Sequence, residues 1–124
     1  MLFRSAVVSG VLSAFPTSLS PQTGTSVSVQ PTFTWVDPAN AGSYTYQFSL
    51  CCSNNSDIWD IPGQNSNANG FSSSITSIPW GTDPTGGGST PVPTSLTLNT
   101  NYTWQITLQD SNGNSAATQV QYQP

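Results

Sequence analysis

Two adjacent cysteines, Cys51 and Cys52, are the first residues of this 124-residue sequence that invite a chemical interpretation. A cysteine acts as a nucleophile only where a neighbouring base or cation favours its thiolate, and the chain contains no His and no Lys. A zinc site would need further Cys or His ligands. Two structural interpretations therefore stay open: separate thiols at the end of a strand, or a vicinal disulfide that stiffens the following loop. Adjacent Cα atoms across a trans peptide lie about 3.8 Å apart, below the usual disulfide range.

A pair of carboxylates, Asp57 and Asp60, raises the question of glycosidase chemistry, which uses two such groups. On a regular strand, side chains three positions apart point to opposite faces, so we expect these two to act separately at a turn or strand edge. His, Lys and Glu are absent from the chain, which leaves Asp as the main residue type for acid–base work. We therefore predict no catalytic residues and no enzyme activity.

Aromatic residues outside the regular strands suggest a different chemistry, the stacking of sugars. Trp59 and Trp80 lie among Asn, Gln and Asp residues, and an exposed indole can stack on a sugar ring while polar side chains bind its hydroxyls. Phe71 has similar neighbours, and Asp57 and Asp60 flank Trp59. These five residues form the predicted ligand site. In the alternative interpretation the rings plug the ends of the hydrophobic core.

The segment Asp110-Ser111-Asn112-Gly113-Asn114 offers oxygen atoms at alternate positions, as the start of a calcium loop does. It lacks the glycine and the glutamate that such a loop needs further on, where Ser115 and Gln121 stand. A hairpin turn, in which Asn112 and Gly113 tolerate positive φ, is the favoured interpretation. We predict no metal site and no cofactor.

The charge composition excludes several classes of partner. Only 5% of the residues are charged, namely Arg4 and five aspartates, and the formal net charge is −4. Nucleic-acid binding requires several cations to neutralise phosphates, so we predict no nucleic-acid partner. No apolar run approaches the ~20 residues that span a bilayer, so we predict no membrane insertion.

The elements that position these residues are short strands. Apolar side chains alternate with polar ones at residues 32–35, 44–50, 102–108 and 118–122, and weaker strand signals occur near residues 58–61 and 71–80. Ten glycines and ten prolines punctuate the chain, and the Gly-rich stretch at residues 81–93 is expected to be flexible. The pattern predicts an all-β fold, an antiparallel β-sandwich of about seven strands, with Tyr44, Phe48, Trp104 and Ile106 in its core.

Four stretches carry a family resemblance: LSPQTGTSVSVQPTFTW, SYTYQFSL, LTLNTNYTWQITLQD and GNSAATQVQYQP. In them the chain resembles the immunoglobulin-like and fibronectin type III-like sandwich modules of secreted bacterial proteins. Leu96 stands six residues before Tyr102, a spacing similar to the tyrosine corner of such domains, where the phenol bonds a nearby backbone group. The resemblance covers residues 17–124 and implies one domain there.

Residues 1–16 form a separate N-terminal segment. Arg4 followed by AVVSGVLSAF has features of a signal peptide. Alternatively, the segment is a linker or the strand end of a preceding region in a longer protein. Leu2-Phe3-Arg4-Ser5 is also what a common sequencing adapter encodes in one reading frame, which would make residues 1–5 an artefact.

The resemblance implies a non-catalytic structural or adhesive spacer module of a larger extracellular or cell-surface bacterial protein. Its expected partners are other domains of the same parent chain. One alternative is a carbohydrate-binding module that binds polysaccharide through exposed Trp residues and neighbouring amide side chains. A second alternative is a filament subunit in which residues 6–15 add a strand to a neighbour's open sheet edge. With few charges on the surface, self-association through edge strands is expected unless Pro21, Pro31 or the loops protect those edges.

Overall fold

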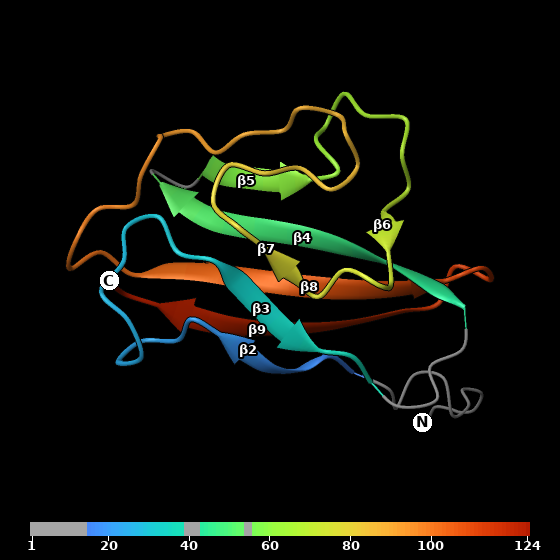
Figure 1. Ribbon diagram of the computed structural model, residues 1–124, viewed down its shortest axis with the longest axis horizontal. Coiled ribbons are helices and arrows are strands. Elements are labelled where there is room, and N and C mark those ends of the chain that lie inside the picture. The colour runs from blue at the N-terminus through green and yellow to red at the C-terminus, as the bar shows by residue number, and fades with distance from the viewer. Residues whose placement is uncertain (1–14, 39–42, 54–55) are drawn as a thin grey trace.

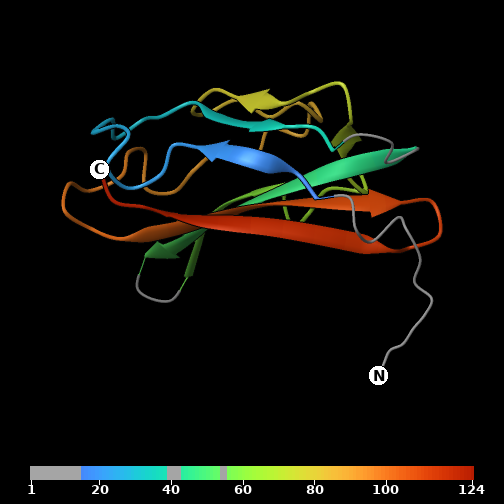
Figure 2. The same cartoon turned by 90° about the horizontal axis from the view of Figure 1, so that it is seen from below.

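Two antiparallel β-sheets lie face to face in the computed structural model, which describes residues 15–38, 43–53 and 56–124 (Figures 1 and 2). One sheet has the order β2 (Thr17–Ser20), β3 (Phe33–Val36) and β7 (Ser77–Ile78). The other contains β4 (Tyr44–Ser53), β5 (Ser56–Ile61), β6 (Phe71–Ser72), β8 (Tyr102–Asp110) and β9 (Ser115–Tyr122). Its order is β5-β4-β8-β9, and β6 pairs with β4. The predicted all-β sandwich is confirmed, with eight strands and no helix among the described residues.

The centre of the larger sheet is the antiparallel pair of β4 and β8, the two longest strands in the described chain. Their register runs without interruption from Tyr44 opposite Asp110 to Cys51 opposite Thr103. Because side chains alternate along a strand, this register places the apolar positions of both strands on one face and the polar positions on the other. Figure 2 shows the three-stranded sheet on one side of the larger sheet. The buried apolar residues of β4 and β8 pack in the core between the two sheets, and the alternate polar positions lie on the other face.

Aromatic rings fill the space between the sheets. Phe33 of β3 lies with its ring centroid 4.9 Å from that of Phe48 and 5.0 Å from that of Trp104. Most ring pairs are tilted or edge-on, the geometries that aromatic pairs prefer. Phe48, Trp104 and Ile106 are buried as predicted, whereas Tyr44 is only partly buried and packs at the margin of the core.

The stretch FSSSITSIPW differs from its prediction as a single strand. It forms two strands of two residues each, β6 and β7, which belong to different sheets. A turn separates them, in which the Ile75 N–H donates to the carbonyl of Ser72 at 3.0 Å. The chain therefore crosses from one sheet to the other within this stretch.

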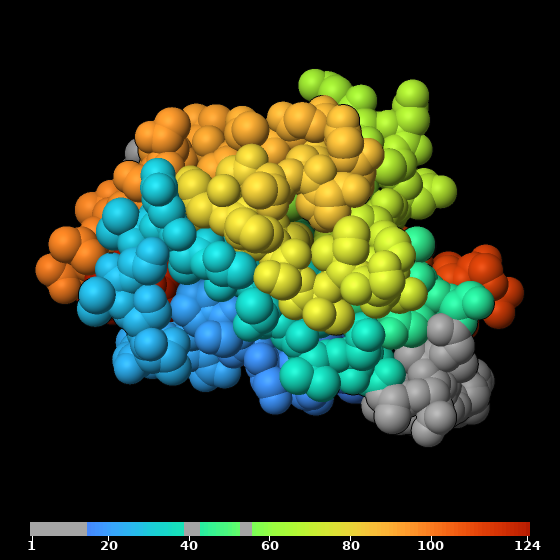
Figure 3. Space-filling view, in the orientation of Figure 1, coloured from blue at the N-terminus to red at the C-terminus, as the bar shows by residue number. Residues whose placement is uncertain are grey.

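The Gly-rich loop at residues 81–93, which its composition predicts to be flexible, is held by hydrogen bonds to one carboxylate. The Asp83 carboxylate accepts hydrogen bonds from the Thr85 N–H at 2.8 Å, the Thr85 hydroxyl at 2.6 Å and the Ser89 N–H at 2.7 Å. One carboxylate thus satisfies three donors across the glycines, a role that composition alone does not reveal. In Figure 3 the atoms of this loop, yellow to orange, form a continuous surface with those of the preceding segment.

This loop also covers the outer edge of β5. The Val92 N–H donates to the carbonyl of Ile58 at 2.9 Å, and the Ser89 hydroxyl donates to the carbonyl of Asp60 at 2.6 Å. These bonds occupy backbone groups that a free edge would offer to another chain. The loop is therefore one of the features that protect a sheet edge from pairing with another chain.

Pro16, directly before β2, is fully buried, and its carbonyl accepts a hydrogen bond from the Thr118 hydroxyl at 2.8 Å. Residues 1–14 lie outside the described part, and so do the interpretations placed on them, including the added strand at residues 6–15. Within the described ranges no helix has the length and apolar character needed to cross a membrane.

Candidate functional site

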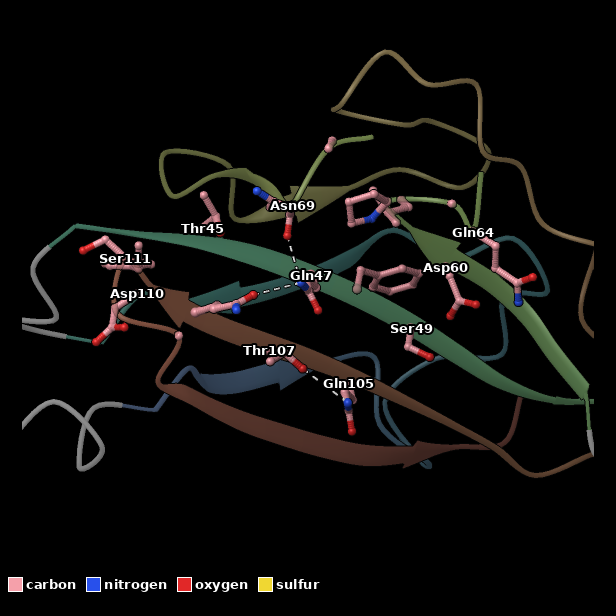
Figure 4. A pocket seen from close by; sticks show the side chains of 18 of the residues that line it. Thr45, Gln47, Ser49, Asp60, Gln64, Asn69, Gln105, Thr107, Asp110 and Ser111 are labelled. Carbon is pink, nitrogen blue, oxygen red and sulfur yellow. Dashed lines mark hydrogen bonds between the residues drawn. The ribbon is translucent and has the colours of Figure 1, made fainter. Parts of the chain in front are cut away.

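A polar groove lies on the outer face of the five-stranded sheet, away from the core (Figure 4). Its volume is about 890 Å³. The floor consists of outward-facing residues of β4 and β8, and one wall is the segment between β5 and β6. The floor and wall residues labelled in Figure 4 are Thr45, Gln47, Ser49, Gln105 and Thr107 on the floor, and Gln64 and Asn69 on the wall.

The wall approaches β4 closely because Gly70 has no side chain. A Cβ atom at this position would come within 2.7 Å of the Tyr46 carbonyl oxygen and 2.8 Å of the Thr45 hydroxyl oxygen. Such distances are too short for any other residue without movement of the backbone. Gly70 therefore allows the segment that ends at β6 to stand directly beside the floor of the groove.

A chain of hydrogen bonds fixes the side chains in the middle of the groove. The Gln47 Nε2 group donates to the Asn69 carbonyl at 2.8 Å and to the Gln109 Oε1 atom at 3.1 Å (Figure 4). Beside it, the Gln105 Nε2 group donates to the Thr107 hydroxyl at 3.3 Å. These bonds join the wall to both strands of the floor and orient three amides toward the same groove.

The carboxylate of Asp60 lies at one end of the groove and its pKa is raised. Partial burial is the main cause, the nearby Asp57 charge adds to it, and the Ser49 hydroxyl acts in the opposite direction. The expectation that Asp57 and Asp60 point to opposite faces is therefore wrong. The pairing of β4 with β5 shifts between Leu50 and Cys51, a β-bulge that turns both Ile58 and Trp59 into the core.

The carboxylate of Asp110 lies at the other end of the groove and is already used by the hairpin turn. It accepts hydrogen bonds from the Asn112 N–H and the Asn114 N–H, both at 2.9 Å, and from the Asn114 side chain at 3.1 Å. These bonds, the Asn114 amide first, lower the pKa of Asp110. Gly113 completes the turn with a φ of 84°. Asp60 is therefore the carboxylate better placed to meet a ligand.

The aromatic residues of the predicted ligand site do not form an exposed platform. Trp59 is 2% exposed and Phe71 is 3% exposed, so the expectation that their rings are free to stack on a sugar is wrong. Both belong to the core, because Trp59 pairs opposite the buried Leu50 and β6 lays Phe71 against Trp35 and Tyr46. Trp80 is partly exposed, packs on Trp59 with ring centroids 5.6 Å apart, and donates from its Nε1 to the Thr94 carbonyl at 2.8 Å.

The two cysteines are joined as a vicinal disulfide at the far end of β4. Cys51 is partly buried and Cys52 is exposed. The pair lies outside the groove lining. Of the two interpretations that the sequence left open, the structure contains the disulfide.

Leu96 and Tyr102 are both buried at the corner that leads into β8. The Thr97 N–H donates to the Tyr102 phenol oxygen at 2.9 Å. This contact is the one that a tyrosine corner requires, a phenol bonded to the backbone a few residues upstream. It fixes the direction in which the chain enters β8, and hence the position of the groove floor.

The amides of the groove were absent from the predicted ligand site. A signal for them exists in the sequence, because Gln47, Gln105 and Gln109 occupy the polar positions of the two most regular alternating runs. Those positions face away from a predicted core and so face either solvent or a ligand. Alternation alone does not distinguish the two, since the wall at residues 62–70 comes from a segment with no regular pattern.

No protein-family model, curated protein or solved structure gave a match to this chain. In the ranges that the structure describes, no group of three or more His, Cys, Asp or Glu side chains gathers where it could hold a metal ion.

Proposed function

We propose that the chain is a non-catalytic, fibronectin type III-like module that serves as an adhesive or spacer unit of a larger extracellular or cell-surface bacterial protein. The observation that carries this proposal is the bond between the Thr97 N–H and the Tyr102 phenol at the entrance to β8. A tyrosine corner in a sandwich of two antiparallel sheets is a hallmark of the immunoglobulin-like architecture. Sequence and structure thus support the same resemblance at the same residues.

The chemistry of the groove supports a role without catalysis. Its titratable side chains include Asp60 and Asp110, and the second of these is hydrogen-bonded within its own turn. General acid–base catalysis needs groups whose pKa values suit opposite roles at one reacting centre. A binding or spacing role requires only a stable scaffold and a complementary surface.

The spacer role has a direct test in solution. Three copies of the 124-residue chain joined in tandem should give an extended particle in small-angle X-ray scattering, with a maximum dimension that grows by a constant amount per copy. Modules that collapse onto one another into a compact particle would contradict the proposal.

The absence of catalysis has a test of its own. A panel of glycoside and peptide substrates should show no turnover that is lost in the Asp57→Asn and Asp60→Asn variants.

Carbohydrate binding is the second candidate, and the groove is the observation that favours it. The polar side chains of its floor are uncharged amides and hydroxyls. An adhesive module of an extracellular protein could use such a surface to bind polysaccharide.

A further inference from the structure

We propose that the groove on the outer face of β4 and β8 binds an uncharged oligosaccharide chain, with Gln47, Gln105 and Gln109 as direct ligands. This inference deepens the carbohydrate-binding candidate and rests on it, not on the spacer role. It assigns a site different from the aromatic residues that the sequence suggested. It also assigns a class of ligand, which the following arguments narrow in turn.

The side chains of the groove match the hydrogen-bonding character of sugars. A sugar hydroxyl both donates and accepts, and a primary amide offers two donors and one carbonyl acceptor on a single planar group. Amides from β4 and β8 and hydroxyls from Thr45, Ser49 and Thr107 line the same floor. The Asp60 carboxylate at one end adds an acceptor-only group, which suits a pair of hydroxyl donors.

Charge decides between neutral and anionic ligands. No Lys, Arg or His lines the groove, and the single cation of the sequence, Arg4, lies outside the described residues. The charged side chains of the lining are both acidic, Asp60 and Asp110. A phosphorylated, sulfated or uronic acid ligand would meet repulsion without a compensating partner, whereas a neutral sugar chain meets only dipoles.

The amides are held in place before a ligand arrives. Gln47 is fixed through its Nε2 group by Asn69 and Gln109, and within the described residues no hydrogen bond occupies its Oε1 atom or the Gln109 Nε2 group. Gln105 is oriented by its bond to Thr107. A long polar side chain that is already immobilised loses less conformational entropy on binding, so each hydrogen bond contributes more to the affinity.

The shape of the groove fits a chain rather than a single small molecule. Its volume of about 890 Å³ lies within the ~300–1,000 Å³ of small-molecule sites, so its length and not its volume favours a chain. It runs along β4 from the Asp110 turn to Asp60, and its lining does not include β9. The partly buried Pro62 in its wall offers an apolar surface to the C–H groups of a sugar ring. Because the floor has amides instead of indoles, we expect binding that is driven by enthalpy.

The test is isothermal titration of the full chain with hexasaccharides of four neutral types, derived from cellulose, xylan, mannan and chitin, and with hexagalacturonate as the anionic probe. We expect at least one neutral hexasaccharide to bind and hexagalacturonate not to bind. The Gln47→Ala and Gln105→Ala variants should each weaken that binding by about fivefold or more, the effect of losing one or two hydrogen bonds. Gln123→Ala is the matched control, because Gln123 is exposed and lies outside the groove. It should leave the affinity unchanged.

Each contrary result has a separate meaning. If no neutral hexasaccharide binds, both this inference and the carbohydrate-binding candidate fail, while the spacer role stands. If binding survives in the Gln47→Ala/Gln105→Ala double variant but is lost in Trp80→Ala, the carbohydrate candidate holds and the groove is the wrong site. Tighter binding of hexagalacturonate would overturn the assignment of a neutral ligand. Thermal unfolding of every variant shows whether a loss of binding is a loss of folding.

Discussion

The strands β4 and β8 have two faces of opposite character. The inner face carries Tyr46, Phe48, Leu50, Trp104 and Ile106, each at most 2% exposed. The outer face carries hydroxyls and amides that form the floor of the groove. The two sets alternate along the same backbone, so one register determines both faces at once.

The two faces differ in what constrains their residues. The inner face is constrained by packing, because close-packed rings tolerate little change in volume. Packing does not constrain the outer face in this way, since many different polar residues could occupy its positions. Its network of amides, bonded from strand to strand and to the wall, is therefore not required by the sandwich and is consistent with the binding role proposed above.

The largest expected difference in stability is between substitutions of two neighbouring residues that lie on opposite faces of β8. Trp104→Ala should destabilise the protein by about 3–5 kcal/mol or prevent folding, because a fully buried ring and the bond from its Nε1 to the Pro21 carbonyl are lost. Gln105→Ala, one residue further on, should cost less than about 1 kcal/mol. Urea denaturation of both variants measures the contrast. Equal losses would show that the outer face contributes to the core after all.

A smaller effect is expected at the entrance to the inner face. Tyr102→Phe keeps the ring and removes only the phenol oxygen that accepts from the Thr97 N–H. The expected loss is about 1 kcal/mol, the usual contribution of one hydrogen bond that is partly shielded from water. Denaturation midpoints of the wild type and the variant give this value. An unchanged midpoint would show that the corner does not stabilise the start of β8.

The sandwich could be predicted from the sequence because its strongest signals are local. Alternation in residues 44–50 and 102–108 specifies two strands and their inward faces, and the spacing of Leu96 and Tyr102 indicates the corner between sheets. These features depend on neighbours along the chain. They can be recognised without knowing which residues lie across the core.

The site could not be predicted in the same way because it depends on irregular features. The bulge in β5 adds Ile58 to the inner face and brings Asp57 near Asp60, and nothing in the residue pattern marks an extra residue there. The order of the Gly-rich loop depends on one carboxylate, Asp83, that bonds donors up to six residues away. The wall beside Gly70 depends on a close approach to β4 that only the folded chain makes.

The loop at residues 81–93 lies on neither face, and the contribution of its Asp83 carboxylate to stability can be tested by changing the pH. Hydrogen bonds from Thr85 and Ser89 outweigh the opposing effect of burial and lower the pKa of Asp83. A depressed pKa means that the ionised group stabilises the folded state above its ordinary pKa of 3.8, and that this contribution declines as the pH falls through the folded value. We expect Asp83→Asn to be less stable than the wild type at pH 7, and the two to converge as the pH falls below the depressed pKa of the folded state. Thermal unfolding across this range measures the difference, and a constant gap at all pH values would contradict the role of the charge.

The smallest expected effect lies on the outer face and has the opposite sign. Partial burial and the Asp57 charge raise the pKa of Asp60, so its ionised form disfavours the folded state. That penalty is present above the folded pKa and disappears as the pH falls below the ordinary value of 3.8. Asp60→Asn should therefore be slightly more stable than the wild type at pH 7, by less than about 1 kcal/mol because water screens this partly exposed pair, and equally stable at pH 3. If the same variant binds neutral oligosaccharides more weakly, then Asp60 is retained for the ligand at a cost to the fold. A variant that is less stable at pH 7 would instead show that Asp60 belongs to the scaffold, as the residues of the inner face do.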